Sequence, residues 1–196
     1  FALAVVYPRA GNIAGGGFAV YRKANGERGS LDFREKAPLQ SSRNMYLDDS
    51  QNVIDDLSSF GGLSVGVPGS VDGMIALHHK LGSLPFASLI QPAIDLAENG
   101  FSLTIKEAQK LNDYQVDFLS ANDSISYFYN GGNWKTGDLL FLPELANTLR
   151  LIRDKGREGF YSGEVADNML SEIQKSGGIM KQADLDKYQS IWRDVV

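Results

Sequence analysis

Residues 18–34 read FAVYRKANGERGSLDFR, and this stretch indicates how the chain begins to fold. The alternation over residues 18–22 is typical of a strand, and residues 30–34 predict the strand that returns beside it. Between them, Asn25-Gly26 is a hairpin turn signal, in which both central residues are expected to adopt positive φ. The stretch therefore predicts an antiparallel hairpin.

The second strand of this hairpin has an apolar face and a polar face. Its period of two places Leu31 and Phe33 on one face, and Asp32 and Arg34 on the other. Arg34 is thus expected to leave the strand on its polar face, just before a loop that ends at Pro38.

Outside the hairpin the sequence is mainly helical. A short apolar run at residues 2–7 suits a helix end or a buried strand, and residues 39–69 are irregular apart from a strand predicted within residues 60–69. Caps, prolines and glycines mark the starts and ends of six predicted helices. The first three run from a Ser70 cap to Gly82, from Pro92 to Gly100, and from a Thr104–Glu107 capping box to about Phe118. The other three run from Pro143 to Gly156, from Ser162 or Gly163 to Gly177, and over residues 182–188. Strands followed by a helical block predict an α+β or layered α/β fold, and not a Rossmann fold.

Composition places the chain among ordinary globular proteins and excludes several functions. The 196 residues are 43% hydrophobic and 22% charged, and such a length can bury a substantial core. The formal net charge of -5 argues against nucleic acid or an anionic membrane surface as a partner. The absence of cysteine excludes disulfides, thiolate metal sites and thiol catalysis. No apolar run reaches about 18 residues and no signal peptide is visible, so no membrane span is expected.

Both ends of the sequence lack a leading or closing element. The chain opens on Phe1-Ala-Leu-Ala-Val-Val-Tyr7 and stops at Trp192-Arg-Asp-Val-Val196. We therefore expect the natural termini to lie outside it, and interpret the sequence as a fragment.

Most residue groups that could carry chemistry have a plainer interpretation. The glycine run over residues 11–17 lacks the spacing of a phosphate-binding or dinucleotide-binding loop, and is interpreted as close backbone packing before a strand. His78 and His79 diverge by about 100° on a helix, so they cannot share a metal ion, and we expect no metal site.

The remaining candidates are interpreted in the same way. The pairs Asp48-Asp49 and Asp55-Asp56 lie in polar loop sequence and are expected to be solvated. An aromatic cluster is expected to form core beside a glycine turn; it comprises Tyr127, Phe128, Tyr129 and Trp134. No residue resembles a chain-start nucleophile, since the three threonines are placed in a cap, a loop and a helix; they are Thr104, Thr136 and Thr148.

Arg34 is the residue best placed to meet a ligand. Its planar guanidinium can bind a carboxylate through two parallel hydrogen bonds, which a lysine cannot reproduce. The alternative is a structural ion pair with Asp32 or Glu35. The residues alone leave these two roles open.

The segment around Arg34 resembles a known signature. Asp32-Phe-Arg-Glu-Lys-Ala-Pro38 is similar to the signature of the γ-glutamyltranspeptidase large subunit. Further segments resemble that family in the same order along the chain: Ala4–Pro8, Gly11–Phe18, Gly66–Gly73, Leu89–Ile94, Leu96–Phe101, Phe160–Gly163, Gly177-Gly178 and Asp184–Tyr188. Two positions differ little in consequence: Ala14 stands where many relatives have a fourth glycine, and Lys36 follows the variable position.

The resemblance implies an N-terminal-nucleophile hydrolase fold, a four-layer αββα sandwich. Residues 1–196 would be a single-domain fragment of the large subunit. In this family one precursor cuts itself into a large and a small subunit, and the new N-terminal Thr of the small subunit attacks the γ-glutamyl amide. Water, an amino acid or a peptide then accepts the glutamyl group from the acyl-enzyme. The nucleophile is therefore expected in the missing small subunit, and the fragment alone is expected to be inactive.

By the same resemblance, Arg34 binds the α-carboxylate of the γ-glutamyl group. The implied partners are the small subunit and glutathione or related γ-glutamyl compounds, with no cofactor, and the implied location is periplasmic or secreted. Two alternatives stay open. One is a related acylase or a capsule poly-γ-glutamate enzyme with the same fold, and the other is a non-catalytic module that holds a carboxylate.

Overall fold

The computed structural model describes residues 1–8, 13–121 and 127–195, and the chain divides into two compact units. The first unit comprises Phe1–Gly11 and Ala87–Arg150, and the second comprises Asn12–Phe86 and Leu151–Val196. The described strands pair only in antiparallel fashion, and helices occur in both units. The predicted α+β class is confirmed.

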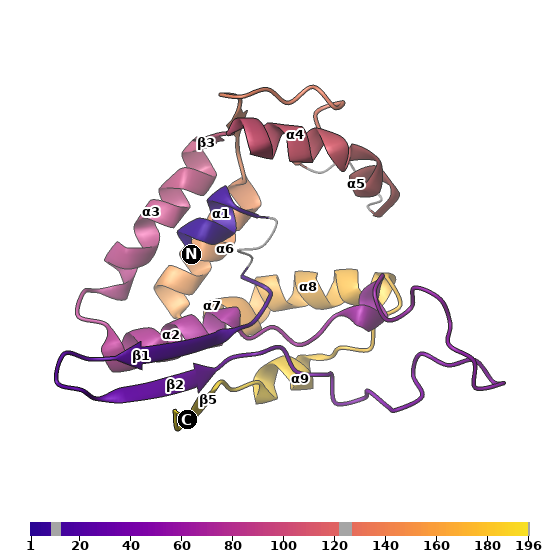
Figure 1. The fold of residues 1–196 in the computed structure, drawn as a ribbon, viewed down its shortest axis with the longest axis horizontal. Helices are drawn as coiled ribbons and strands as arrows, with labels where there is room; N and C mark the ends of the chain where they lie inside the picture. The colour runs from indigo at the N-terminus through magenta and orange to yellow at the C-terminus, as the bar shows by residue number, and fades with distance from the viewer. Residues whose placement is uncertain (9–12, 122–126, 196) are drawn as a thin grey trace. The chain divides into compact units, whose positions relative to one another are not determined.

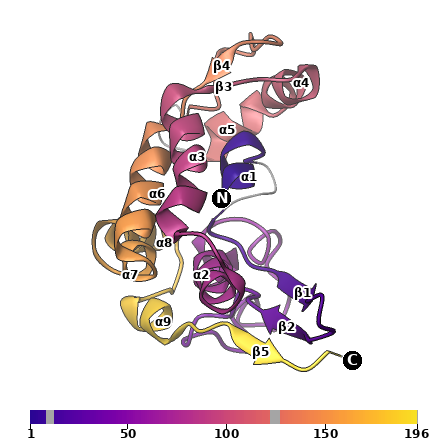
Figure 2. The ribbon, with the colours of Figure 1, turned by 90° about the vertical axis from the view of Figure 1, so that its left-hand side faces the viewer.

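The second unit is built on a small antiparallel sheet. Its strands are β1 (Phe18–Arg22), β2 (Arg28–Asp32) and β5 (Ile191–Arg193), in the order β1-β2-β5. Figures 1 and 2 both show the hairpin with β5 beside β2. The hairpin is confirmed, and its second strand receives an unpredicted partner from the far end of the sequence.

The turn of this hairpin differs from the expected one. Gly26 has a φ of 88°, but Asn25 does not have positive φ. The N–H of Gly26 donates to the carbonyl of Lys23 at 3.0 Å, and the N–H of Lys23 donates to Glu27 at 2.7 Å. This is a three-residue loop with one left-handed glycine. Such a loop needs positive φ only at its last residue, so the two-residue turn was wrong.

The core of the second unit forms on the apolar face of β2. Leu31 is fully buried and Phe33, one residue beyond the strand, is 6% exposed. Helix α2 (Ser70–Leu81) packs here through Gly73, where an added Cβ would lie 2.4 Å from the Phe33 ring. The predicted inward face is confirmed, although β2 ends at Asp32 and not at Arg34.

The start of α2 corrects the predicted cap. The N-cap residue is Gly69, and Ser70 is the first residue of the helix. The N–H groups of Gly69 and Ser70 both donate to the carbonyl of Gly15, at 2.8 and 2.9 Å. The N–H groups of Asp72 and Gly73, which a Ser70 cap was expected to satisfy, donate instead to the Tyr161 hydroxyl at 3.4 Å and to the carbonyl of Gly69 at 2.9 Å.

Residues 60–69 do not form the predicted strand. Gly62–Ser64 is a short 3-10 helix (η1), and Val67 makes a single bridge to Lys36. An added Cβ at Gly62 would lie 2.2 Å from the carbonyl oxygen of Ile173. Gly62 thus allows close packing against the helix that contains Ile173, where the glycines of this stretch had been interpreted as turns around a strand.

Residues 37–61 of the second unit are turns and loops, as predicted, apart from a bridge between Leu47 and Val53, and the part from residue 158 to residue 187 is mostly helical. Its further helices are α7 (Glu158–Tyr161), which was not predicted, α8 (Gly163–Lys175) and α9 (Gln182–Lys187). Ser162 is the N-cap of α8 and Gly177, with a φ of 84°, follows its end, as predicted.

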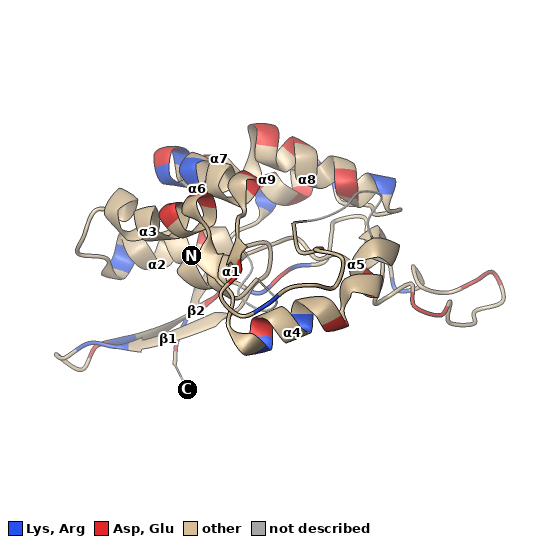
Figure 3. Cartoon of the chain, turned by 90° about the horizontal axis from the view of Figure 1, so that it is seen from above, with Lys and Arg blue, Asp and Glu red and all other residues tan. Residues whose placement is uncertain are grey.

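The described residues of the first unit form five helical segments and a two-stranded ladder. They are α1 (Ala2–Val6), α3 (Phe86–Asn99), β3 (Phe101–Ser102), α4 (Ile105–Asp113), α5 (Gln115–Ala121), β4 (Leu139–Leu140) and α6 (Pro143–Lys155), of which α3 and α6 cross the boundary along the chain. The Thr104–Glu107 capping box is confirmed, but its helix ends at Asp113 and a second one begins. Figure 3 shows both signs of charge along α4.

Helix α3 corrects the role given to Pro92. Pro92 lies inside the helix and does not start it. The residues on its inner face are buried; they are Ile90, Ala93, Ile94 and Ala97. Because this apolar face is buried from Ile90 to Ala97, burial outweighs the one hydrogen bond that proline removes.

Candidate functional site

Arg34 lies two residues beyond the end of β2, on the polar side of the chain. Its side chain is 62% exposed, whereas the preceding Phe33 is buried. The N–H of Arg34 donates to Oδ1 of Asp32 at 3.1 Å. The buried residue and this hydrogen bond fix the backbone while the guanidinium faces solvent. The alternation of the sequence correctly predicted this placement.

The two carboxylates beside Arg34 have different partners. Asp32 pairs with Arg193 of β5, with Nη2 at 2.8 Å from Oδ2. Its hydrogen bonds from the Arg34 N–H and from Arg193 hold the pKa of Asp32 below its ordinary value. Arg34 instead has Nη1 at 3.4 Å from Oε2 of Glu35. The alternative of an ion pair with Asp32 is therefore excluded, and the one with Glu35 is present.

The pair between Arg34 and Glu35 is weak by its geometry. Oε2 of Glu35 is buried, lies within ion-pair distance, and makes no hydrogen bond to a described residue. A bidentate arginine–carboxylate pair has two parallel hydrogen bonds of about 2.7–2.9 Å. The guanidinium of Arg34 therefore keeps donors for a better-oriented carboxylate.

Two glycine-containing segments hold the backbone around Arg34. Gly17 and Phe33 exchange hydrogen bonds of 3.2 and 2.9 Å, and Lys36 and Val67 exchange bonds of 3.2 and 2.7 Å. An added Cβ at Gly16 would lie 2.6 Å from both the Glu35 nitrogen and the Phe33 oxygen. The interpretation of the glycine run as close backbone packing is confirmed for its described part.

Replacement of Gly16 by alanine is expected to lower the free energy of unfolding by about 1–3 kcal/mol, because the clashing atoms are backbone and cannot rotate away. Gly17→Ala is the matched control, since its nearest neighbours are Phe33 ring carbons at 3.1 and 3.2 Å. Thermal unfolding of the full-length variants compares the two. An equal loss in both variants would contradict the close-packing role.

Residues that the sequence did not single out contact the same segment. The hydroxyl of Tyr188 donates to the carbonyl of Arg34 at 2.8 Å. Burial raises the pKa of Tyr188 to about 12, so this hydroxyl stays protonated and donates at neutral pH. Nζ of Lys36 donates to the carbonyl of Gln189 at 2.8 Å. The sequence assigned no role to Lys36, which makes this contact. Tyr188 is the last residue of Asp184–Tyr188, one of the segments that resemble the family.

The histidines and acidic pairs have local roles. Nε2 of His78 lies 2.9 Å from the carbonyl of Leu84, just beyond the end of α2, in agreement with the predicted capping or surface role. His79 is exposed on the same helix. The acidic pairs at residues 48–49 and 55–56 are exposed, as expected. Within the described residues, no cluster of three acidic or histidine side chains could hold a metal ion.

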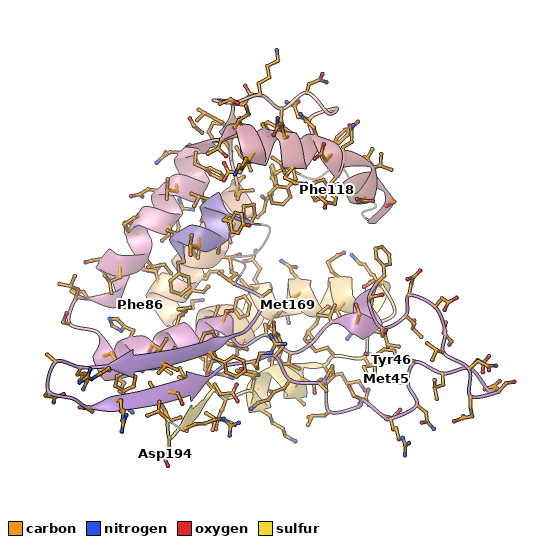
Figure 4. The ribbon with its side chains drawn as sticks, viewed as in Figure 1. Met45, Tyr46, Phe86, Phe118, Met169 and Asp194 are labelled. Carbon is orange, nitrogen blue, oxygen red and sulfur yellow. The ribbon has the colours of Figure 1, made fainter. Side chains whose placement is uncertain are left out.

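The aromatic cluster corrects a prediction. Tyr127 is 48% exposed, and the other three members are only half-buried, so the cluster is not core. Nε1 of Trp134 donates to the carbonyl of Phe128 at 2.9 Å, and the Phe128 ring stacks on Phe118, labelled in Figure 4. Phe118 and Phe128 line part of an open, largely apolar hollow in the first unit, beside α4 and α5. The cluster covers a loop and not a close-packed interior.

The threonines occupy the predicted settings. Thr104 caps α4, Thr136 is exposed in a loop, and Oγ1 of Thr148 donates to the carbonyl of Glu144 within α6. Each hydroxyl of Thr104 and Thr148 has a local structural contact.

Comparisons with known proteins agree over the whole chain. A sequence model of the gamma-glutamyltranspeptidase family matches residues 1–196. A glutathione hydrolase proenzyme of Pseudomonas sp. (strain A14) is 47% identical over 97% of this chain and 33% of the relative. The chain therefore spans about a third of the length of the curated relatives it matches.

Solved structures show the same likeness. The γ-glutamyltranspeptidase of Helicobacter pylori matches with a TM-score of 0.94 and 47% identity, over 100% of this chain and 56% of that one. A cephalosporin acylase of Bacillus halodurans matches with a TM-score of 0.84 at 26% identity, over 97% of this chain and 36% of that one.

Proposed function

Because the chain belongs to the γ-glutamyltranspeptidase family, we propose that it is part of an enzyme that cleaves the γ-glutamyl amide of glutathione and related compounds. The glutamyl group passes to water, an amino acid or a peptide. Residues 1–196 form a single-domain fragment of the large subunit in this proposal, within a four-layer αββα sandwich. The word proenzyme in the relative's name supports a precursor that is cut into two subunits.

The observation that carries the proposal is the setting of Arg34. A guanidinium that is 62% exposed stands on a backbone held by Phe33 and Asp32, with a single loosely oriented carboxylate beside it. The α-carboxylate of a γ-glutamyl donor can form the two parallel bonds that Glu35 does not make. It would displace Glu35 from Arg34 without breaking a hydrogen bond between them.

The chemistry itself requires the missing small subunit. Its N-terminal Thr attacks the amide carbon, the amine leaves with a proton, and an ester to the enzyme remains. Water or an acceptor amine then breaks this ester and restores the hydroxyl. Arg34 lies on the donor side of this scheme and binds the same carboxylate throughout, so it contributes to binding more than to the chemical step. The fragment alone is therefore proposed to be inactive.

The proposal extends to partners and location. The partners are the small subunit and a small γ-glutamyl substrate, without nucleic acid, metal or cofactor. The location is periplasmic or secreted, by analogy with the family. Among the described helices, none has the length and apolar character needed to cross a bilayer.

The closest competing function is a related acylase on the same scaffold. The likeness to a cephalosporin acylase at 26% identity supports it less than the likeness at 47% supports the γ-glutamyl enzyme. A capsule poly-γ-glutamate enzyme also remains an alternative, as does a module that binds a carboxylate without chemistry.

Release of the leaving amine by the full-length protein, an aromatic amine from an anilide or the amine of the bicyclic nucleus from a cephalosporin, separates the γ-glutamyl enzyme, the acylase and the binding module. Three substrates are compared: a γ-glutamyl anilide, a glutaryl anilide that lacks only the α-amine, and a cephalosporin with an amide side chain. We expect turnover of the γ-glutamyl anilide to exceed the other two by at least tenfold. Preference for the cephalosporin would assign an acylase, and the absence of turnover with all three would assign a binding module.

A further inference from the structure

The backbone of Arg34 is held by a buried tyrosine from the other end of the chain. Tyr188 is 2% exposed and its hydroxyl donates to the Arg34 carbonyl at 2.8 Å. Its ring stacks on Tyr161, with centroids 6.0 Å apart and planes 8° from parallel. An added Cβ at Gly69 would lie 2.0 Å from the Tyr188 hydroxyl. The Tyr188 ring is therefore held against Tyr161, and Gly69 leaves the space that its hydroxyl occupies beside the Arg34 carbonyl.

A half-buried ion pair fixes Tyr188 in turn. Nη2 of Arg157 donates to the carbonyls of Tyr188 and Leu185, at 2.8 and 2.9 Å. Nε of the same guanidinium donates to Oδ1 of Asp72 at 3.0 Å, while Oδ2 of Asp72 accepts the N–H of Ser190 at 2.7 Å. The backbone on both sides of Tyr188 is thus tied to one pair of charges.

A second tie reaches the other side of Arg34. Nζ of Lys36 donates to the carbonyl of Gln189 and lies 4.9 Å from the centre of the Tyr188 ring. Arg34 itself is mostly exposed, so side-chain packing contributes little to its direction. The direction of its side chain therefore depends on how the Arg34 backbone is held. The hydroxyl of Tyr188 holds that backbone directly, through its hydrogen bond to the Arg34 carbonyl.

We propose that Tyr188 is a positioning residue for Arg34: its hydroxyl fixes the Arg34 carbonyl and thereby the direction of the guanidinium, and the Asp72–Arg157 pair holds Tyr188 in place. The inference rests on the proposed binding of a donor carboxylate by Arg34. A guanidinium that samples several orientations loses conformational entropy each time a donor binds, and this loss weakens binding. Loss of the hydroxyl therefore weakens donor binding while the chemical step on the missing subunit is unchanged.

Tyr188→Phe in the full-length protein removes the hydroxyl and keeps the ring. We expect KM for the γ-glutamyl anilide to rise roughly two- to tenfold, the size of one lost hydrogen bond, with kcat within about twofold. Tyr46→Phe is the matched control, because its hydroxyl also donates to a carbonyl, that of Leu63, at 3.2 Å. The control is expected to leave KM unchanged. An equal rise in KM in both variants, or none in Tyr188→Phe, would overturn the inference.

Arg34 provides a second readout that a merely structural role would not alter. If Tyr188 acts through Arg34, then Tyr188→Phe raises KM in the natural background and has no further effect on an Arg34→Ala background. Independent effects on KM in the two backgrounds would refute the positioning role.

The inference can fail separately from the proposed function. If the natural full-length protein does not turn over any γ-glutamyl anilide, the proposed function fails, and crystal structures of the two tyrosine variants then decide the positioning role. A carbonyl and guanidinium of Arg34 that shift in Tyr188→Phe but not in Tyr46→Phe support it. An Arg34 that stays in place in both variants rejects it.

Discussion

Replacement of Arg34 by alanine in the full-length protein is expected to reduce kcat/KM for a γ-glutamyl anilide by about 10- to 100-fold, mainly through a higher KM. A hydrogen bond to a charged group contributes about 1.5–3 kcal/mol, and about 1.4 kcal/mol corresponds to a factor of ten. Arg34→Lys should recover part of the loss, because lysine keeps the charge but lacks the planar pair of donors. Steady-state kinetics of amine release measures both variants.

The control for this experiment comes from the substrate as well as from the protein. A 4-aminobutyryl anilide lacks only the α-carboxylate, so Arg34→Ala should not slow its turnover further if the guanidinium binds that carboxylate. Arg22→Ala, at the exposed end of β1 in the same hairpin, should leave the kinetics unchanged. Equal losses with both anilides would show that Arg34 acts through its ion pair with Glu35 and not through the substrate.

Replacement of Arg157 by alanine is expected to lower the free energy of unfolding by about 3 kcal/mol. Its side chain and that of Asp72 are 27% and 13% exposed, and removal of one partner leaves a largely buried charge unpaired. The carbonyls of Leu185 and Tyr188 also lose their donor. We place the effect at the lower end for buried pairs because the guanidinium is not fully enclosed. Calorimetry of the full-length protein measures it.

An exposed pair of the same length provides the comparison. Lys23 and Glu27 lie 3.0 Å apart, as Arg157 and Asp72 do, but their side chains are 40% and 43% exposed. Lys23→Ala should cost less than about 1 kcal/mol. Burial is then the factor that separates the two variants, and similar losses would mean that the Asp72–Arg157 pair is not a structural anchor.

Local signals in the sequence predicted the local parts of this fold. The alternation from residue 30 to residue 34 placed Phe33 and Arg34 on opposite faces, and the Thr104–Glu107 box marked the start of α4. Glycine and proline were less informative, because each serves more than one purpose. Gly62 allows close packing where turns were expected, and Pro92 sits inside α3 because the buried face of that helix outweighs its missing donor.

Partners that are distant in the sequence could not be predicted. Strand β5 has three residues, with no pattern of its own to distinguish it from a loop, and becomes a strand only by pairing with β2. Asp72 and Arg157 are 85 positions apart, and nothing in either neighbourhood indicates the other. The position of Arg34 was therefore predictable from its own strand, whereas the residues that hold its backbone were not.

The pairing of the hairpin with the far end of the chain also affects the order of events during synthesis. Arg34 and Tyr188 are separated by 154 positions, and Ser30 and Arg193 by 163. A ribosome that adds about 5–20 residues per second leaves an interval on the order of 10–30 s between them. Throughout that interval the nascent hairpin has an unpaired strand edge, which chaperones can bind and which other nascent chains can meet. The segment around Arg34 is thus translated well before Tyr188, and its backbone can be held by that residue only after Tyr188 has been synthesised.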